Sequence, residues 1–288
     1  MGLEIDTLSA SVRDRSEWRP ESFVNDAGSS HADVEDVREY YRKILPCYEK
    51  EAIARAGLAF WQGLARRLAP GRILELGSGL GRITGALSRL APTIGIDISF
   101  EMLGRAAGRL PAASRARFVA ADIRDAVFGC RFDLIVAPAD PFSHLTAMRD
   151  RRRALRRVAG QLSPRGRFVL EGLCRSRDIE YRQRRIEYPG GVLRIGEEWR
   201  PLGARDLWRA RYRYREIRPG RPERTLAASF TARAWNPREV RTLFASCGLA
   251  VESLWGDFSR RPFRPGMRRL IIVARPRARF LHRKKSAG

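Results

Sequence analysis

Three glycines and two acids stand where they could hold a nucleotide. Residues 72–82 read Arg-Ile-Leu-Glu-Leu-Gly-Ser-Gly-Leu-Gly-Arg, an apolar run that leads into glycines and then into a helix-like pattern. Glycines let a backbone turn tightly and approach a ligand, and the first turn of a helix offers unpaired N–H groups. Two further apolar runs end in Asp97 and Asp122. An acid at the tip of the second strand can accept hydrogen bonds from both ribose hydroxyls, and we expect one at the tip of the third to accept from an exocyclic amine.

The glycine spacing separates two classes of cofactor. A dinucleotide fold places its glycines as G-x-G-x-x-G against a pyrophosphate. Here they fall as G-x-G-x-G, with Glu75 two residues before the first. Ile98 and Ile123 directly follow the two acids and could enclose a flat base between them. The pattern favours a nucleoside without a pyrophosphate.

Five segments in this order resemble the motifs of the class I S-adenosylmethionine-dependent methyltransferases, over roughly residues 40–275. The segments are Glu-Leu-Gly-Ser-Gly-Leu-Gly (75–81), Gly-Ile-Asp-Ile-Ser (95–99), Ala-Asp-Ile (121–123), Phe-Asp-Leu-Ile-Val-Ala (132–137) and Leu-Ser-Pro-Arg-Gly-Arg-Phe-Val-Leu (162–170). The segment 142–145, Phe-Ser-His-Leu, resembles the corresponding loop of glycine N-methyltransferase-like enzymes of the small-molecule type.

The resemblance implies S-adenosylmethionine as cofactor and assigns residues to it. Asp97 would bind the ribose and Asp122 the adenine amine. Glu75 would orient the glycine loop or hold the ammonium of the methionine moiety through water, and the backbone of Ala137 would accept from that ammonium. The full set of expected cofactor residues is Glu75, Gly77, Ser78, Gly79, Gly81, Asp97, Ile98, Met102, Asp122, Ile123 and Ala137.

The loop after the fourth expected strand, residues 138–145, is predicted to face the methyl acceptor. His144 is a candidate general base for a hydroxyl or an ammonium, with a hydrogen-bonded loop residue as the alternative. Asp140 stands where the resemblance leads us to expect asparagine, which puts a glycine substrate in doubt; it could steer a cationic amine or act as a base. The predicted catalytic residues are therefore His144 and Asp140, and the predicted acceptor-binding residues are Tyr41, Phe142, His144 and Tyr212.

Apolar runs that alternate with helical patterns predict an α/β fold with a doubly wound, mostly parallel, seven-stranded Rossmann-like sheet. We expect a flexible arm (1–30) and a methyltransferase domain (31–276), followed by a basic tail (277–288). Within the domain we expect cap helices (31–70), a cofactor-binding half (71–172), an antiparallel β insertion (174–234), and a final helix with an antiparallel C-terminal hairpin (235–276). Pro46 is predicted to end or kink the first helix.

The β insertion is predicted from strand-period alternation. Trp208, Ala210, Tyr212 and Tyr214 share one parity, and Arg209, Arg211, Arg213 and Arg215 share the other. Turn signals at 188–191 and 218–221 indicate two hairpins. We expect this small sheet to lie over the active-site edge as a lid. We expect the aromatic face to pack against the body, or else to line the pocket, and the arginine face to meet water, or else to bind an acidic group of the acceptor.

Composition excludes some classes of protein. No apolar run reaches the length of a membrane span, and the N-terminus lacks the pattern of a secretory signal. Cysteines 47, 130, 174 and 247 are scattered, which favours reduced thiols in the cytoplasm and gives no metal site. The formal charge of +24 comes mostly from arginine, and a coding bias accounts for it more simply than selection for a charged groove does.

The predicted function is methyl transfer from S-adenosylmethionine to N or O of a small-molecule acceptor, one that is acidic or carries an amine. An RNA or DNA methyltransferase is the first alternative, because the charge would attract nucleic acid at low salt. The stretch Asp-Pro-Phe at 140–142 lacks the second proline of an adenine N6 enzyme, so a nucleic acid substrate is disfavoured. A scaffold that binds the cofactor without turnover is the second alternative. The sequence leaves the oligomeric state open, a homodimer included.

Overall fold

A computed structural model describes residues 31–53, 56–111, 113–175, 178–203 and 206–277 of the 288-residue chain. The arm and nearly all of the basic tail expected from the sequence lie outside the described residues. The helices are α1 (His31–Ile53), α2 (Leu58–Leu68), α3 (Arg82–Leu87), α4 (Phe100–Ala107), the short 3-10 helix η2 (Pro141–His144), α5 (Met148–Gln161) and α6 (Val240–Ser246). The strands are β1 (Ile73–Leu76), β2 (Thr93–Asp97), β3 (Ala116–Ala120), β4 (Phe132–Ala137), β5 (Leu162–Leu173), β6 (Glu180–Tyr188), β7 (Gly191–Pro201), β8 (Leu207–Ile217), β9 (Arg224–Arg233), β10 (Leu249–Trp255) and β11 (Arg269–Pro276).

The main sheet has seven strands in the order β10-β11-β5-β4-β1-β2-β3. The five strands from β3 to β5 are parallel, whereas β11 pairs antiparallel with both β5 and β10. The strand order reverses at β1, so the carboxyl ends of β1, β2 and β4 open onto one crevice, where ligands bind in folds of this kind. The predicted fold class is confirmed, including the antiparallel hairpin at the end.

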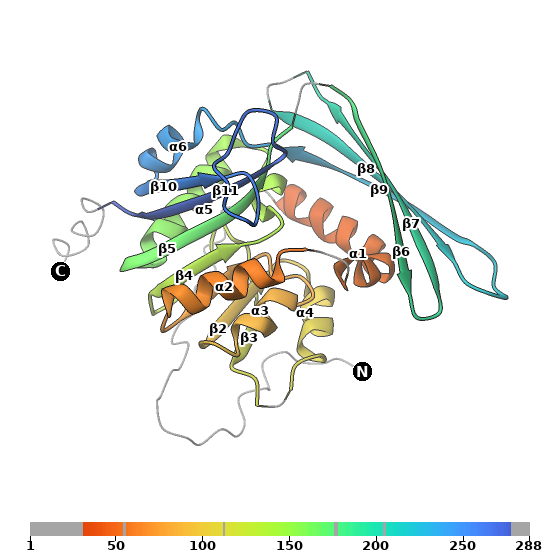
Figure 1. Ribbon diagram of the computed structural model, residues 1–288, viewed down its shortest axis with the longest axis horizontal. Helices are drawn as coiled ribbons and strands as arrows, with labels where there is room; N and C mark the ends of the chain where they lie inside the picture. Colours follow the sequence, from red (N-terminus) through yellow and green to blue (C-terminus); the bar gives the residue numbers. More distant parts are fainter. Residues whose placement is uncertain (1–30, 54–55, 112, 176–177, 204–205, 278–288) are drawn as a thin grey trace.

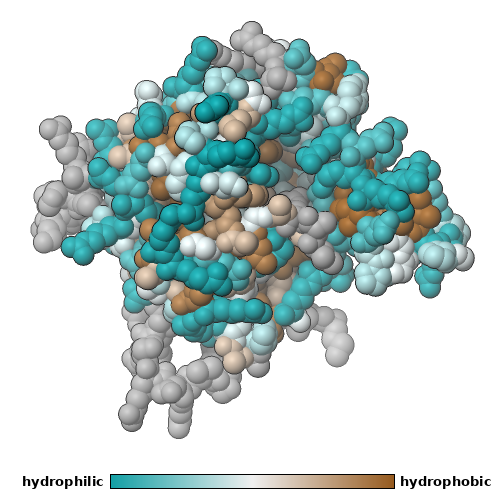
Figure 2. All heavy atoms as spheres, viewed as in Figure 1, coloured by the Kyte–Doolittle hydropathy of each residue, from teal (hydrophilic) through white to brown (hydrophobic). Residues whose placement is uncertain are grey.

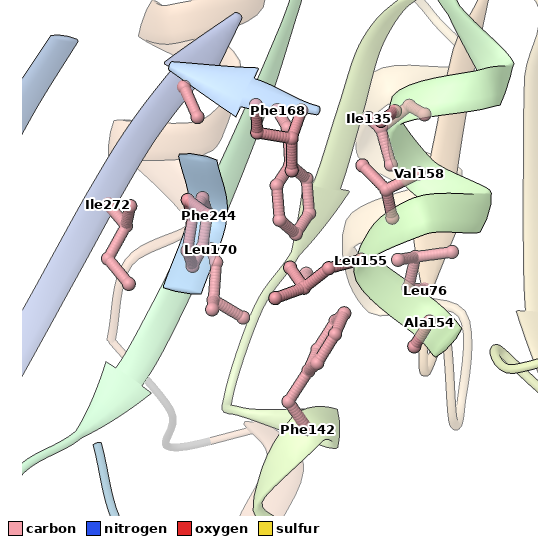
Figure 3. Close-up of a cluster of buried hydrophobic side chains, with 14 of the residues drawn as sticks. Leu76, Ile135, Phe142, Ala154, Leu155, Val158, Phe168, Leu170, Phe244 and Ile272 are labelled. Carbon is pink, nitrogen blue, oxygen red and sulfur yellow. The ribbon is translucent and has the colours of Figure 1, made fainter. Parts of the chain in front are cut away.

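Helices cover both faces of this sheet because its central strands are apolar on both sides. One core joins the sheet to α5 and α6 and includes Leu155, Phe168 and Phe244 (Figure 3). The other joins the opposite face to α2 and α3, around Trp61 and Leu87. The two cores fix the strand ends, and through them the loops that carry the predicted motifs.

Strands β6 to β9 form a second, antiparallel sheet of four strands (Figure 1). Helix α1 lies between this lid sheet and the main sheet and packs Tyr40, Ile44 and Cys47 against the inner face of the lid. On the outer face, Arg209, Arg211, Arg213 and Arg215 are exposed, and hydrophilic side chains cover much of the visible surface in this region (Figure 2). The aromatic residues of β8 therefore face inward, and its arginines face the solvent.

Pro46 does not end the first helix, contrary to one of the two outcomes predicted for it. Helix α1 continues through Pro46 to Ile53. Gly57, the residue directly before α2, has a φ of 98° and adopts the left-handed conformation. A proline inside a helix costs about 3 kcal/mol. Ile44, Leu45 and Cys47 on either side of Pro46 are buried, and their packing against neighbouring elements offsets that cost.

Candidate active site

The glycine loop after β1 is held in a conformation that side chains rarely adopt. Gly77, Gly79 and Gly81 have φ values of 71°, 51° and 71°. A Cβ at Gly77 would lie 2.7 Å from Cβ of Pro141, so the loop also passes too close to η2 for any side chain there. The positive φ and the close approach to Pro141 both require glycine at position 77. The backbone of the loop therefore lies at the carboxyl end of the sheet.

Asp97, the last residue of β2, locks this loop. Its Oδ2 accepts a hydrogen bond from the backbone N–H of Gly79 at 2.8 Å, and its Oδ1 accepts from that of Ser99 at 2.9 Å. Burial raises the pKa of Asp97, while these N–H groups favour its charged form. The carboxylate lines the crevice and retains lone pairs that ribose hydroxyls could use.

Glu75 lies behind the loop and does not line the crevice. It is buried in β1, and its Oε2 accepts a hydrogen bond from the hydroxyl of Thr84 on α3. Burial raises the pKa of Glu75 to about 8. Its position fits the first of its two predicted roles, orienting the loop.

Asp122 is held by a neighbouring arginine. The Nη2 of Arg124 donates to Oδ2 of Asp122 at 2.7 Å, and Arg124 also pairs with Asp150 at 3.3 Å. Ile98, Met102 and Ile123 line the same end of the crevice. The Arg124 pair fixes the rotamer of the Asp122 carboxylate, which still faces the cavity.

Arg38 supports the site from behind Ile98, and the sequence did not reveal it. Its Nε donates to the backbone carbonyl of Ile98 at 2.8 Å. Helix α1 thereby contacts the second motif directly. No local pattern marks Arg38, since the two residues are 60 positions apart.

A cavity of about 670 Å³ runs from the glycine loop to the lid. Ten predicted site residues line it: Tyr41, Gly77, Gly79, Asp97, Ile98, Met102, Asp122, Ile123, His144 and Tyr212. Six others do not: Glu75, Ser78, Gly81, Ala137, Asp140 and Phe142. At Gly81 the missing Cβ faces the ring of Phe118 instead, and Ala137 is fully buried in β4, with Pro138 and Ala139 at the cavity in its place.

His144 and Tyr41 meet at the cavity wall. The hydroxyl of Tyr41 lies 3.0 Å from Nε2 of His144. The Nδ1 of His144 is buried and has no hydrogen-bond partner among the described residues. Burial lowers the pKa of His144 to about 4, so the imidazole is uncharged at neutral pH. The pair brings an uncharged base next to a phenol.

Asp140 does not reach the cavity, contrary to its predicted catalytic role. Its Oδ2 accepts from the N–H of Leu173 at 2.9 Å and its Oδ1 accepts from Nε1 of Trp235 at 3.0 Å. Burial raises its pKa to about 6. The carboxylate joins the η2 loop to the end of β5, which is a positioning role.

Phe142 also lies away from the acceptor side. Its ring is fully buried and packs near Phe168 and Trp235, at 6.0 Å between ring centroids in each case. Figure 3 shows Phe142 among the side chains of the core between α5 and the sheet. The placement does not support the prediction that Phe142 contacts substrate.

The lid contributes a charged wall that the sequence did not reveal. Arg184 on β6 donates to Oε1 of Glu51 on α1 at 2.8 Å, and Arg175 donates to Oε2 of Glu180 at 2.6 Å. Glu197 on β7 completes this group, and all five residues line the cavity. The strand alternation on β6 and β7 could have suggested Glu180, Arg184 and Glu197 as inward-facing, but the pairing of Arg184 with Glu51 depends on where α1 packs.

Comparison with known proteins agrees with this geometry. Residues 73–166 match a family described as a methyltransferase domain. The chain carries a class I S-adenosylmethionine-dependent methyltransferase domain. The match spans β1 to β5, which hold the glycine loop, Asp97 and Asp122. S-adenosylmethionine is the cofactor of the methyltransferase, and the cavity residues fit it, since Asp97 offers acceptors to a ribose and the loop lines the cavity at Gly77 and Gly79. No curated protein matches the sequence.

Solved methyltransferases share the fold. An S-adenosylmethionine-dependent methyltransferase from Clostridium acetobutylicum has 17% identity, with 82% of this chain and 99% of that chain covered and a TM-score of 0.68. CalS10, an amino pentose methyltransferase from Micromonospora echinaspora, has 18% identity, with 80% and 95% covered and a TM-score of 0.65. KedS8, a sugar N-methyltransferase from Streptoalloteichus, has 17% identity, with 93% and 99% covered and a TM-score of 0.62. Within the described residues, no helix is both long and apolar enough to cross a membrane.

Proposed function

We propose that the methyltransferase transfers the methyl group to an amine nitrogen of a small polar acceptor, with an amino sugar as the favoured class. The observation that carries the proposal is the Tyr41–His144 pair at the cavity wall, with the pKa of His144 lowered to about 4 by burial. His144 is placed beside the nucleophile, with Tyr41 as its hydrogen-bond partner; Asp140, expected to steer a cationic amine or act as a base, takes no part in this arrangement.

The basicity of His144 favours nitrogen over oxygen as the nucleophile. A hydroxyl must lose its proton as the new bond forms, and that requires a base whose pKa lies near the operating pH. An imidazole with a pKa of about 4 is too weak for this task. An amine attacks with its own lone pair, so it needs alignment and exclusion of water more than it needs a base.

The chain's residues divide the work along the cavity. Asp97 would accept hydrogen bonds from the ribose, Ile98 and Ile123 would enclose the adenine, and Asp122 would accept from its amine. The bound sulfonium supplies an electrophilic methyl carbon. His144 and Tyr41 both line the cavity and would orient the amine there. The lid sheet would cover the acceptor and keep water out.

The acceptor class draws support from the wall opposite the glycine loop and from the structural neighbours. Charged side chains and the hydroxyls of Tyr212 and Tyr214 line the lid side, and such a wall suits a ligand with several polar groups. CalS10 and KedS8 are described as amino pentose and sugar N-methyltransferases. We take the acceptor to be of that chemical kind.

Methyl transfer from S-adenosylmethionine with a deuterated methyl group tests the proposal. The purified protein is incubated with amino sugars and, in parallel, with the sugars in which a hydroxyl replaces the amine, and the products are read by mass spectrometry and NMR. We expect labelled N-methyl products from the amino sugars and none from the hydroxyl counterparts. O-methylated products, label transferred to added RNA in preference to amines, or cofactor binding without any turnover would each contradict it.

A further inference from the structure

Glu197 stands apart from the other carboxylates of the lid wall. The carboxylates of Glu51 and Glu180 each have an arginine within 2.8 Å, Arg184 and Arg175 respectively. Glu197 lies 3.7 Å from Arg184 and 4.0 Å from Arg175, both beyond hydrogen-bond distance. Its side chain is only 11% exposed. Glu197 is therefore the carboxylate of this wall whose contacts with Arg184 and Arg175 are both longer than a hydrogen bond.

The two oxygens of Glu197 differ. Oε1 accepts hydrogen bonds from Nε1 of Trp199 at 2.8 Å and from the hydroxyl of Tyr212 at 3.1 Å. Among the described residues, Oε2 has only the long contact with Arg184, at 3.7 Å. Carboxylate oxygens can each accept about two hydrogen bonds, and a buried charge that lacks donors is unfavourable. Oε2 thus has unused acceptor capacity on the wall of the cavity.

Neighbouring side chains fix Glu197 in place. Trp199 is buried, the guanidinium of Arg175 stacks on its ring at 3.8 Å, and Phe230 packs against it edge to face. Tyr212 stacks on Phe230 with an angle of 9° between the rings. Both donors to Oε1 are therefore rigid, and a ligand meets the free oxygen in one orientation, which lowers the entropy cost of binding.

We propose that Oε2 of Glu197 binds a hydrogen-bond donor on the acceptor, a hydroxyl or ammonium group other than the amine that is methylated. The inference rests on the proposed function for its choice of acceptor. Glu197 comes from β7 of the lid, whereas His144 comes from η2 beside the glycine loop. One acceptor that reaches both must carry two polar groups, so Glu197 selects amines with a second donor over simple amines.

Three six-membered amines of matched size test this selection by calorimetry on protein saturated with S-adenosylhomocysteine. Cyclohexylamine has one amine, trans-4-aminocyclohexanol adds a hydroxyl, and trans-1,4-diaminocyclohexane adds a second ammonium. A hydrogen bond to a charged group is worth about tenfold or more in affinity. We expect the second and third probes to bind at least about tenfold more tightly than the first. Equal affinities for the three probes, or no measurable binding of any, would overturn the inference without any variant.

Two adjacent glutamates provide a matched pair of variants. Glu197→Gln keeps the shape and an acceptor for Trp199 and Tyr212 but removes the charge, and Glu198→Gln removes a charge from the next residue, which pairs with Arg200 on the opposite face of the sheet. We expect the tenfold preference for the diamine to disappear in Glu197→Gln and to persist in Glu198→Gln. Persistence in both variants would overturn the inference.

This binding experiment is independent of methyl transfer. If the preference depends on Glu197 and no amine is methylated, the inference about Glu197 stands and the proposed function fails. If amines are methylated and the preference is absent, the proposed function stands and the inference about Glu197 fails. Unchanged affinity for S-adenosylhomocysteine in Glu197→Gln shows that the variant is folded.

Discussion

The hydroxyl of Tyr41 and Nε2 of His144 lie 3.0 Å apart although 103 positions separate them in the chain. Tyr41 belongs to α1, the helix that also contacts the second motif through Arg38 and the lid through Glu51. One helix therefore touches the cofactor end of the cavity, the predicted base and the acceptor wall.

Replacing either member of this pair is expected to slow methyl transfer. His144→Ala removes the group that would orient the amine, and we expect kcat to fall by about a hundredfold, the cost of a nucleophile misplaced by about 1 Å. Tyr41→Phe is expected to have a smaller effect in the same direction, because the imidazole remains but loses its partner. Single-turnover kinetics measure the change. Cofactor affinity, measured by calorimetry, serves as the control and should not change; wild-type rates in His144→Ala would make His144 a structural residue.

The charge state of His144 gives a separate prediction. Burial lowers its pKa to about 4, whereas in the unfolded chain it titrates near 6.5. The unfolded state therefore binds more protons between these values, and this group's contribution to stability is lost as the pH falls from about 6.5 towards 4. An NMR titration of the imidazole, assigned with the His144→Ala variant, should show a neutral ring at pH 6. An inflection near 6.5 would show that the ring is solvated.

Asp97→Ala is expected to weaken cofactor binding at least tenfold, roughly 1.4 kcal/mol or more. The change removes acceptors for the ribose and also releases the N–H of Gly79 that shapes the loop. Calorimetry with S-adenosylmethionine measures the loss. Glu101→Ala is a suitable control, since it removes a nearby exposed carboxylate from the start of α4. Equal affinities for Asp97→Ala and wild type would refute the assignment.

The sequence predicts those parts of the site whose residues lie in short continuous segments next to one strand or helix. Gly77 and Gly79 precede one helix, Asp97 ends one strand and Asp122 follows another, so local pattern is enough to bring them to one edge of a parallel sheet. The seven-stranded fold follows from the same alternation of strands and helices. Local pattern fails for Asp140, because its partner Trp235 is 95 positions away.

The acceptor wall is unpredictable from sequence for a related reason. Glu51 and Arg184 are 133 positions apart and pair only once α1 has packed against the lid. The same packing lets α1 run through Pro46, which a local rule would place at a helix end. Inward parity identifies Glu197 as an inner-face residue of β7, but its free oxygen depends on Trp199, Tyr212 and the distances to two arginines.

Asp140→Ala is expected to lower the free energy of unfolding by about 3 kcal/mol, because the N–H groups of Leu173 and Trp235 would be left buried without an acceptor. Chemical denaturation measures the loss. Trp235→Phe removes one of the two donors, and we expect it to show part of the same destabilisation. A variant with wild-type stability and a large drop in kcat would instead restore the catalytic role that the sequence predicted for Asp140.

Glu75 gives the stability of the fold a dependence on pH. Burial raises its pKa to about 8, and in the unfolded chain a glutamate titrates near 4.3. The folded state therefore holds a proton that the unfolded state has lost, and this group's contribution to stability falls as the pH rises from about 4 to 8. Glu75→Gln mimics the protonated form and keeps an acceptor for Thr84. We expect the melting temperature of Glu75→Gln to exceed that of wild type by more at pH 9 than at pH 5, with the exposed Glu101→Gln showing no such trend. The same difference at both pH values would mean that Glu75 is ionised in the folded protein and would contradict the raised pKa.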